Sequence, residues 1–187
     1  IYGMACNMDE VVSFAKKHKL KIVEDAAQAI GITWDGKHAG TFGEVGSFSF
    51  FADKTITTGE GGLVVTNDDT IYEKLLFIRN QGRIDRGSFI HPEIGYNFRM
   101  TDIQSAIGLA QLEKLDEIIR RKKHILFTYK TNLDSSIKII EPPFQSSHIP
   151  FRVCITVPGG GYDLMDYMKT QGIETRTFFY PLHKQPA

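Results

Sequence analysis

The direct passage from a helical pattern into a short apolar strand, near the start of the chain, most constrains the fold. Apolar residues recur at helical spacing along Met8–Lys19, and lysines gather on the other side and toward the C-terminal end. Leu20–Val23 follows at once as a predicted strand, which ends at Glu24 and Asp25. A helix that leads directly into a strand is typical of α/β proteins, so we expect an α/β domain.

Two further strands are predicted downstream. Gly46–Phe51 and Gly62–Thr66 are short runs rich in aromatic or β-branched residues. Asn67–Asp69 then supplies a turn and a cap before a helix predicted from about Ile71 to Arg79. We therefore expect a three-layer α/β/α domain with a mixed, mainly parallel sheet.

The middle of the chain combines a long connection with a strong helix signal. Gln81–Arg99 has no hydrophobic period and contains several glycines, which predicts an extended connection of the length that is often functional. Thr101, with Gln104 three residues later, forms a capping-box pattern. An apolar stripe follows it, and we expect a helix that continues to about Tyr129.

The pattern of elements changes after Ile137. A strand is predicted within Phe151–Val157, then a glycine turn, then a helix over Tyr162–Thr170. This shift predicts that residues 1–125 belong to the large α/β domain and that residues 126–187 are the start of a smaller α+β domain.

Bulk properties limit the possible partners and compartment. Lys plus Arg number 22 and Asp plus Glu also number 22, so net charge favours neither nucleic acid nor a membrane surface as a partner. No apolar run has the length of a membrane span. Cys6 and Cys154 are far apart, which argues against a disulfide framework and favours a cytoplasmic setting. The six histidines lack metal-ligand spacing, so we expect no metal site. Because the sequence opens at Ile1 without a Met, we expect it to be a piece of a longer chain.

Lys54 is the most informative single residue. It follows a predicted apolar strand and precedes Thr55–Gly62, a glycine-rich stretch that lets backbone approach a ligand closely. Open α/β sheets bind ligands just beyond the ends of their inner strands. A partly desolvated lysine amine there is nucleophilic enough to form an imine with an aldehyde. Taken alone, Lys54 has a simpler alternative, because most lysines are solvated surface groups.

Asp25 and Ser49 give Lys54 a chemical context. Asp25 follows the first predicted strand and can point into the same crevice, although a cap or turn aspartate is an equal alternative for this residue alone. A lysine imine of pyridoxal phosphate needs a carboxylate that keeps the pyridine nitrogen protonated, because the charged ring then acts as an electron sink. Ser49 can offer its hydroxyl to the cofactor phosphate, or bond locally within its strand.

Three separated runs carry a resemblance to a known family. They are VEDAAQAIG (Val23–Gly31), GTFGEVGSFSFFADKTITTGEGG (Gly40–Gly62) and GYNFRMTDIQSAIGLAQLEKL (Gly95–Leu115). In this order they resemble the sugar aminotransferases of the DegT/DnrJ/EryC1/StrS family, and the resemblance covers nearly the whole chain. It implies the fold type I architecture of aspartate aminotransferase. It points to the branch that moves an amino group from glutamate to the C4 keto carbon of a nucleotide-linked 4-keto-6-deoxy sugar, a step in polysaccharide biosynthesis such as that of O-antigen.

The resemblance implies a set of residues that bind pyridoxal 5′-phosphate. Lys54 would form the imine with the cofactor and later carry the proton between the substrate carbon and the cofactor. Asp25 would pair with the pyridine nitrogen, and Gln28 would lie against the ring or its 3-hydroxyl. Ser49 would bind the phosphate.

The resemblance also implies that a second subunit takes part. Asn97 would reach the cofactor phosphate in the partner's site, so that a homodimer would share its active sites. His183 matches a family histidine that lines the sugar pocket.

Several alternatives stay open at this point. The substrate could be a UDP- or dTDP-linked keto sugar that is aminated at C3 or C4. A neighbouring branch dehydrates the sugar at C3 and has a histidine in place of the lysine, so Lys54 argues against that branch. A non-catalytic regulatory or scaffold relative would keep the fold but would not need Asp25, Ser49 and Lys54 together.

Overall fold

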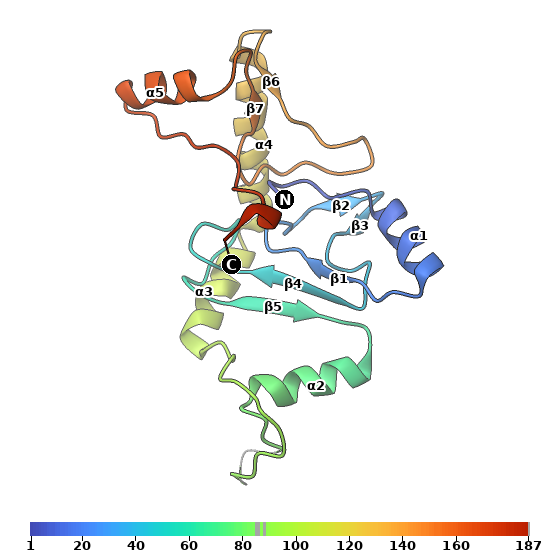
Figure 1. The fold of residues 1–187 in the computed structure, drawn as a ribbon. Helices are drawn as coiled ribbons and strands as arrows, with labels where there is room; N and C mark the ends of the chain where they lie inside the picture. Colours follow the sequence, from blue (N-terminus) through green and yellow to red (C-terminus); the bar gives the residue numbers. More distant parts are fainter. Residues whose placement is uncertain (85–86, 88, 187) are drawn as a thin grey trace.

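A three-stranded mixed sheet lies in the middle of the molecule, whose computed structural model describes residues 1–84, 87 and 89–186 (Figure 1). The sheet has the order β1-β4-β5, with strands at Val23–Asp25, Val45–Ser49 and Gly62–Val65. β1 and β4 run parallel, whereas β4 and β5 run antiparallel. The expected mixed α/β sheet is confirmed, with one pair of each kind in this sheet.

The first strand starts later than its sequence suggests. We expected Leu20–Val23, but β1 begins at Val23. The N–H of Ile22 donates to the Glu44 carboxylate at 2.7 Å instead of to a neighbouring strand. The Glu44 side chain therefore binds the Ile22 N–H group that would otherwise bond to a neighbouring strand.

The central strand ends earlier than predicted. β4 stops at Ser49, and Phe50 and Phe51 lie beyond it. The Phe51 carbonyl accepts from the N–H of Lys54 at 3.0 Å, and the Phe50 carbonyl accepts from the N–H of Thr58 at 2.9 Å. These bonds fold the chain into turns directly after the strand, because they commit the carbonyl groups to local partners.

Three helices form within two residues of their predicted bounds. They are α1 at Met8–His18, α2 at Asp69–Arg79 and α5 at Tyr162–Thr170. The side chains of Asn7 and Asp68 cap the first two by accepting from backbone N–H groups of the first turn. These boundaries follow from local signals in the chain.

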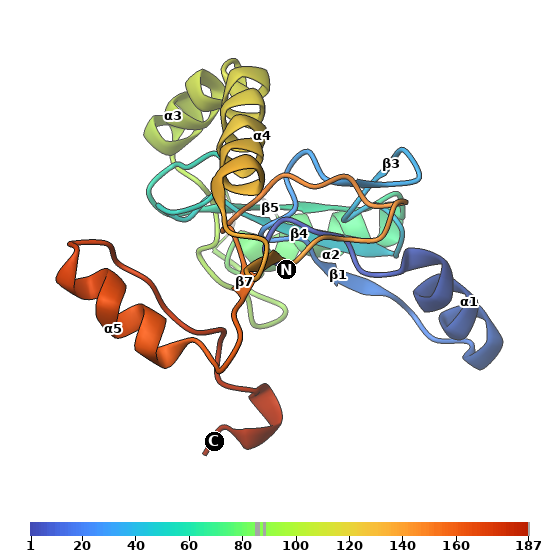
Figure 2. The same ribbon diagram turned by 90° about the horizontal axis from the view of Figure 1, so that it is seen from above.

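The long helix predicted after the connection is two helices. The capping box of Thr101 and Gln104 opens α3 as expected, but α3 covers Asp102–Leu112 and a separate α4 covers Leu115–Asn132. Neither glycine nor proline lies between them to indicate the break. Figure 2 shows both helices on the same side of the sheet.

A small hairpin was not predicted, although its signal is present. Thr33–Trp34 (β2) and Lys37–His38 (β3) pair antiparallel around Asp35 and Gly36. Both turn residues have left-handed φ angles, 45° and 79°, as a type I′ Asp-Gly turn requires. The Thr33 carbonyl accepts from the N–H of Ser147 at 2.8 Å, so the hairpin joins the N-terminal part to a much later segment.

The strand predicted within Phe151–Val157 is shorter than expected. Only Ile155–Thr156 (β7) forms a ladder, with Lys138–Ile139 (β6). The N–H of Phe151 donates instead to the carbonyl of Tyr2 at 3.2 Å. The backbone of Phe151 therefore bonds to the start of the chain and is not part of β7.

Two buried clusters hold the N-terminal part and the segment near residue 150 together. One cluster consists of Tyr2, Phe151 and Cys154, and the other of Ile32, Ala39 and Ile149.

The predicted division between residues 125 and 126 falls inside α4, which runs unbroken through it. This division stays a prediction.

The longest helix of the structure is amphipathic rather than apolar. α4 has 18 residues, and lysines and arginines recur along it. Across the described residues, no helix is both long and apolar enough to cross a membrane.

Candidate active site

Asp25 and Ser49 lie at one edge of the sheet. β1 and β4 are parallel and Asp25 pairs with Ser47, so both strands end at the same edge. Asp25 is exposed, and its Oδ1 accepts from the N–H of Ala27 at 3.0 Å, which leaves Oδ2 available. Ser49 Oγ accepts from the N–H of Phe51 at 3.2 Å, which leaves its hydroxyl proton available to an anion. A carboxylate and a hydroxyl are therefore offered together at this edge.

Lys54 is held in the turn that follows β4. Its side chain is 15% exposed, and its Nζ lies 3.8 Å from Asp53 Oδ1. The same Nζ lies 4.9 Å from the centre of the Phe151 ring. The amine is therefore partly desolvated beside one aromatic face and one carboxylate, as expected for a reactive lysine.

The glycine-rich stretch after Lys54 is fixed against α3. Thr58 is buried and its Oγ1 donates to the Glu60 carbonyl at 2.7 Å, while Gln104 Nε2 donates to the same carbonyl at 3.0 Å. Gly61 has a φ of 147°, and an added Cβ would lie 2.7 Å from Thr58 Oγ1. Glycine is needed here for both reasons.

Glu24, next to Asp25, has a separate task that sequence reasoning missed. Its Oε1 accepts from the N–H groups of Phe42 and Gly43 at 2.5 and 2.8 Å, and its Oε2 accepts from the N–H of Gly40 at 2.6 Å. Strand alternation places Glu24 and Asp25 on opposite faces, which was the available signal. Glu24 thus anchors a loop and leaves Asp25 at the edge of the sheet.

Gln28 follows the first strand and is partly buried. Its Oε1 accepts from the N–H of Tyr2 at 2.6 Å. The Tyr2 ring in turn lies 4.9 Å and 5.8 Å from the rings of Phe178 and Phe179. Gln28 is thereby linked to the C-terminal segment through Tyr2.

Asn97 and His183 do not join the other candidates. Asn97 is exposed and forms an isolated bridge with Asn80. His183 is exposed in the short 3-10 helix η1, Leu182–Lys184. The described contacts connect neither of them to Asp25 or Lys54.

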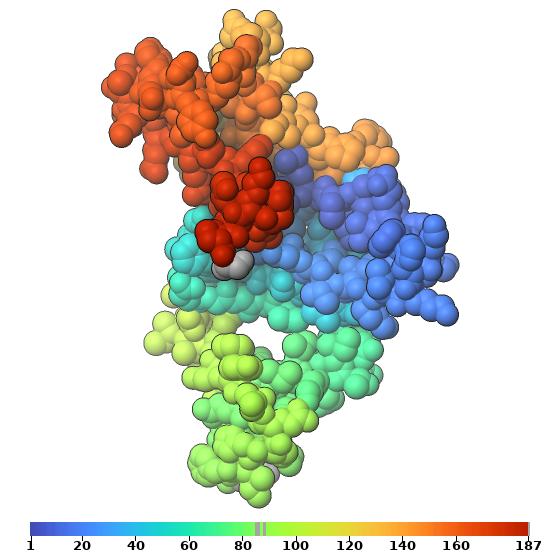
Figure 3. Space-filling model, viewed as in Figure 1, coloured from blue at the N-terminus to red at the C-terminus, as the bar shows by residue number. Residues whose placement is uncertain are grey.

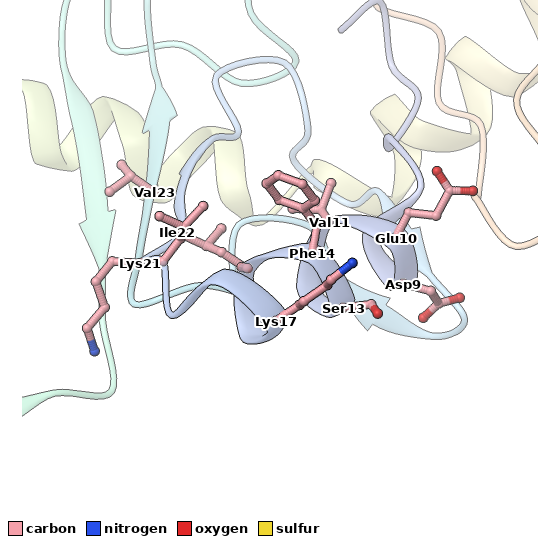
Figure 4. Close-up of a pocket in the computed structure, with 11 residues that line it drawn as sticks. Asp9, Glu10, Val11, Ser13, Phe14, Lys17, Lys21, Ile22 and Val23 are labelled. Carbon is pink, nitrogen blue, oxygen red and sulfur yellow. The ribbon is translucent and has the colours of Figure 1, made fainter.

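A surface hollow lies away from these residues. It measures about 910 Å³ and lies between α1 and the segment before β1. Figure 4 shows its lining, in which the side chains of Val11 and Phe14 from α1 approach Ile22. The hollow is apolar and open, and it contains none of the predicted site residues. Among the described residues, no three of His, Cys, Asp and Glu gather as metal ligands would.

Comparison with known proteins gives the family. The model of the DegT/DnrJ/EryC1/StrS aminotransferase family matches residues 1–187. GDP-perosamine synthase of Escherichia coli O157:H7 is 43% identical over 188 residues, which cover 100% of this chain and 52% of that protein. The chain spans about half the length of the curated relatives it matches.

Solved structures agree with this assignment. A DegT/DnrJ/EryC1/StrS aminotransferase from Brucella abortus superposes with a TM-score of 0.90 at 28% identity, covering 100% of this chain and 50% of that one. GDP-4-keto-6-deoxy-D-mannose-3-dehydratase of E. coli, solved with bound hydrated pyridoxal phosphate, gives a TM-score of 0.80 at 29% identity, covering 93% and 50%. The fold is thus that of about half of a fold type I protein, and this chain belongs to the DegT/DnrJ/EryC1/StrS aminotransferase family.

Proposed function

We propose that the full-length protein is a pyridoxal-phosphate-dependent aminotransferase that moves an amino group from glutamate to the C4 keto carbon of a nucleotide-linked 4-keto-6-deoxy sugar. The observation that carries this proposal is the partly desolvated Lys54, which follows β4 at the edge of the sheet that also holds Asp25. The similarity to GDP-perosamine synthase supports the substrate class.

The residues present fit the cofactor. Asp25 offers a carboxylate oxygen for the pyridine nitrogen, and Ser49 offers a hydroxyl proton for the phosphate. Lys54 offers the amine for the aldehyde, and three of the four residues in Gly59–Gly62 are glycines, which lets this backbone approach a ligand closely. When bound, pyridoxal phosphate supplies an electron sink for the negative charge that develops at the substrate carbon.

Each residue then has a defined task. The Asp25 carboxylate keeps a proton on the ring nitrogen, because an adjacent anion favours the charged form. Ser49 Oγ fixes the phosphate end. Lys54 Nζ would act as the general base and acid in both halves of the reaction, carrying the proton between the substrate carbon and the cofactor. Gln28, linked to Tyr2, orients the ring.

A homodimer with shared active sites completes the proposal. α3 and the connection before it expose large apolar side chains, including Phe89, Ile94 and Ile103, which supports a protein partner on this face. Asn97 lies in that connection, where it can serve a partner subunit's phosphate site. We place His183 in the sugar pocket, the division between the two domains near residue 126, and the protein in the cytoplasm.

A covalent trapping experiment tests the proposal. Full-length protein is saturated with pyridoxal phosphate, reduced with borohydride and digested, and the modified peptide is identified by mass spectrometry. A phosphopyridoxyl group on Lys54 is expected. Folded, saturated protein that is unmodified at Lys54 would overturn the aminotransferase proposal in favour of a dehydratase-like or non-catalytic relative. Assays with GDP-, UDP- and dTDP-linked 4-keto-6-deoxy sugars then identify the substrate.

A further inference from the structure

The residue before Lys54 connects two distant parts of the chain. Asp53 Oδ2 lies 3.2 Å from an NH2 group of Arg152, which is 99 positions later in the sequence. Asp53 Oδ1 lies 3.8 Å from Lys54 Nζ. One carboxylate thus faces two cations, and the arginine is the nearer of the two.

The ring of Phe151 organises the same two cations. Phe151 is 5% exposed, and its ring has Lys54 Nζ at 4.9 Å and the Arg152 guanidinium at 4.4 Å from its centre. Arg152 also donates to the Phe151 carbonyl at 3.1 Å. The guanidinium is therefore held by an aromatic face, a carbonyl and a carboxylate together.

A third cation approaches from α4. Lys122 is half-buried, and its Nζ donates to the Pro150 carbonyl at 3.3 Å. Burial lowers the pKa of Lys122, the nearby Arg152 lowers this pKa further, and Asp53 raises it. The Asp53 carboxylate, which pairs with Arg152 and raises the pKa of Lys122, is next to the lysine that needs a neutral amine to react.

We propose that Asp53 and Arg152 act as positioning residues for Lys54: Arg152 engages the Asp53 carboxylate, holds the lysine-bearing turn against Phe151, and keeps this carboxylate from pairing fully with the Lys54 amine. The inference rests on the proposed function, in which the Lys54 amine reacts with the cofactor aldehyde. Asp53 and Arg152 touch neither substrate nor cofactor in this proposal.

The sign of the effect follows from the charges. An ammonium ion is not a nucleophile, so a carboxylate that pairs closely with Lys54 slows its attack on an aldehyde. Arg152→Met removes the guanidinium but keeps an aliphatic side chain beside Phe151, and Asp53 is then left to Lys54. Adding Asp53→Asn to Arg152→Met removes that competing carboxylate. The second substitution should therefore reverse most of the loss caused by the first.

The test uses full-length protein from which the cofactor has been removed. Pyridoxal phosphate is added, samples are reduced with borohydride over time, and the modified Lys54 peptide is quantified by mass spectrometry. We expect Arg152→Met to slow labelling about two- to fivefold, the range for an ion pair of this exposure, and the double variant to recover most of the loss. Lys130→Met is the matched control, because it breaks a similarly exposed pair with Glu141 that does not involve Lys54.

Each outcome has a distinct meaning. The proposal is overturned if Arg152→Met labels at the wild-type rate, or if the double variant is as slow as Arg152→Met, because a purely structural tie would not be rescued by losing its second member. It is also overturned if Lys130→Met slows labelling equally. Wild-type protein that is never labelled at Lys54 instead contradicts the proposed function itself.

Discussion

The sheet region, which consists of residues 2–56 and 126–154, differs from the region of α2 and α3 in how much of its apolar surface is buried. All buried apolar residues of the described chain lie within residues 2–56 or 126–154. In contrast, no residue of α2 or α3 is buried, and Ile103 and Leu109 of α3 are 76% and 64% exposed. Figure 3 shows α2 and the connection after it, in green, as a lobe that projects from the rest of the molecule.

This difference shows that a helix can be specified locally without having a core of its own. α3 has a complete capping box and an apolar stripe, yet Ile103, Ile107 and Leu112 of that stripe stay 76%, 46% and 52% exposed. The lysine-bearing loop lies between the two regions, because Gln104 of α3 donates to the Glu60 carbonyl. Under the proposed function, the sheet region would carry the chemistry and the exposed region would serve assembly.

The largest effect should come from Lys54→Ala in the full-length protein. If the sheet region carries the chemistry, turnover of the keto sugar should fall by about 10²–10⁴-fold, because the proton carrier and the covalent anchor are both lost. Far-UV circular dichroism should stay unchanged. Lys17→Ala, on an exposed part of α1, is the control and should keep full turnover. Equal losses for both variants would contradict the assignment of Lys54.

The next effect concerns the core of the sheet region. Ile32 is fully buried between Ala39 and Ile149, so Ile32→Ala should lower the free energy of unfolding by about 2–5 kcal/mol. Urea unfolding monitored by fluorescence measures the change. The loss should not depend on protein concentration, because the contacts are within one chain. A change below about 0.5 kcal/mol, the level of an ordinary surface substitution, would show that this cluster does not stabilise the fold.

A substitution on α3 tests whether the exposed region takes part in self-association. Ile103→Asp should leave the folded monomer intact but weaken self-association about tenfold or more, because it places a charge in a buried apolar contact. Sedimentation velocity over a range of concentrations measures the association. Glu113→Asp, at the end of α3, is a conservative control. An unchanged dissociation constant would place the partner surface elsewhere.

The contrast between the two regions also explains what the sequence could predict. Helix starts were accurate where the signal is a cap, as at Thr101, and where a glycine turn precedes the helix, as at Tyr162. Asp35-Gly36 was overlooked because the strands that it joins have two residues each, too short for a hydrophobic period. The break between α3 and α4 was overlooked because neither glycine nor proline lies between the two helices.

The candidate site was predictable to the same extent. Asp25 and Ser49 end their strands and Lys54 follows one, so a parallel arrangement of these strands, as β1 and β4 have, puts them at one edge. Asp53 and Arg152 could not be paired from the sequence, because 99 positions separate Arg152 from its partner and only the packing of Phe151 brings it there. Asn97 and His183 rest on the family resemblance alone, since the described residues give them no contact with the site.

The smallest expected effect concerns His148, and it tests whether water reaches the contact between the N-terminal part of the chain and the segment near residue 150. His148 is partly buried there; burial lowers its pKa below the usual value of 6.5, nearby Lys130 lowers it further, and Glu141 acts in the opposite direction. A histidine whose pKa is lower in the folded state binds fewer protons there than in the unfolded state, so its contribution to stability is complete above the unfolded pKa and declines as pH falls below about 6.5. Unfolding by urea at pH 8 and pH 5.5, for wild type and His148→Gln, measures this dependence. The wild type should lose more stability than the variant between the two pH values, and a parallel loss in both proteins would show that His148 is hydrated in solution.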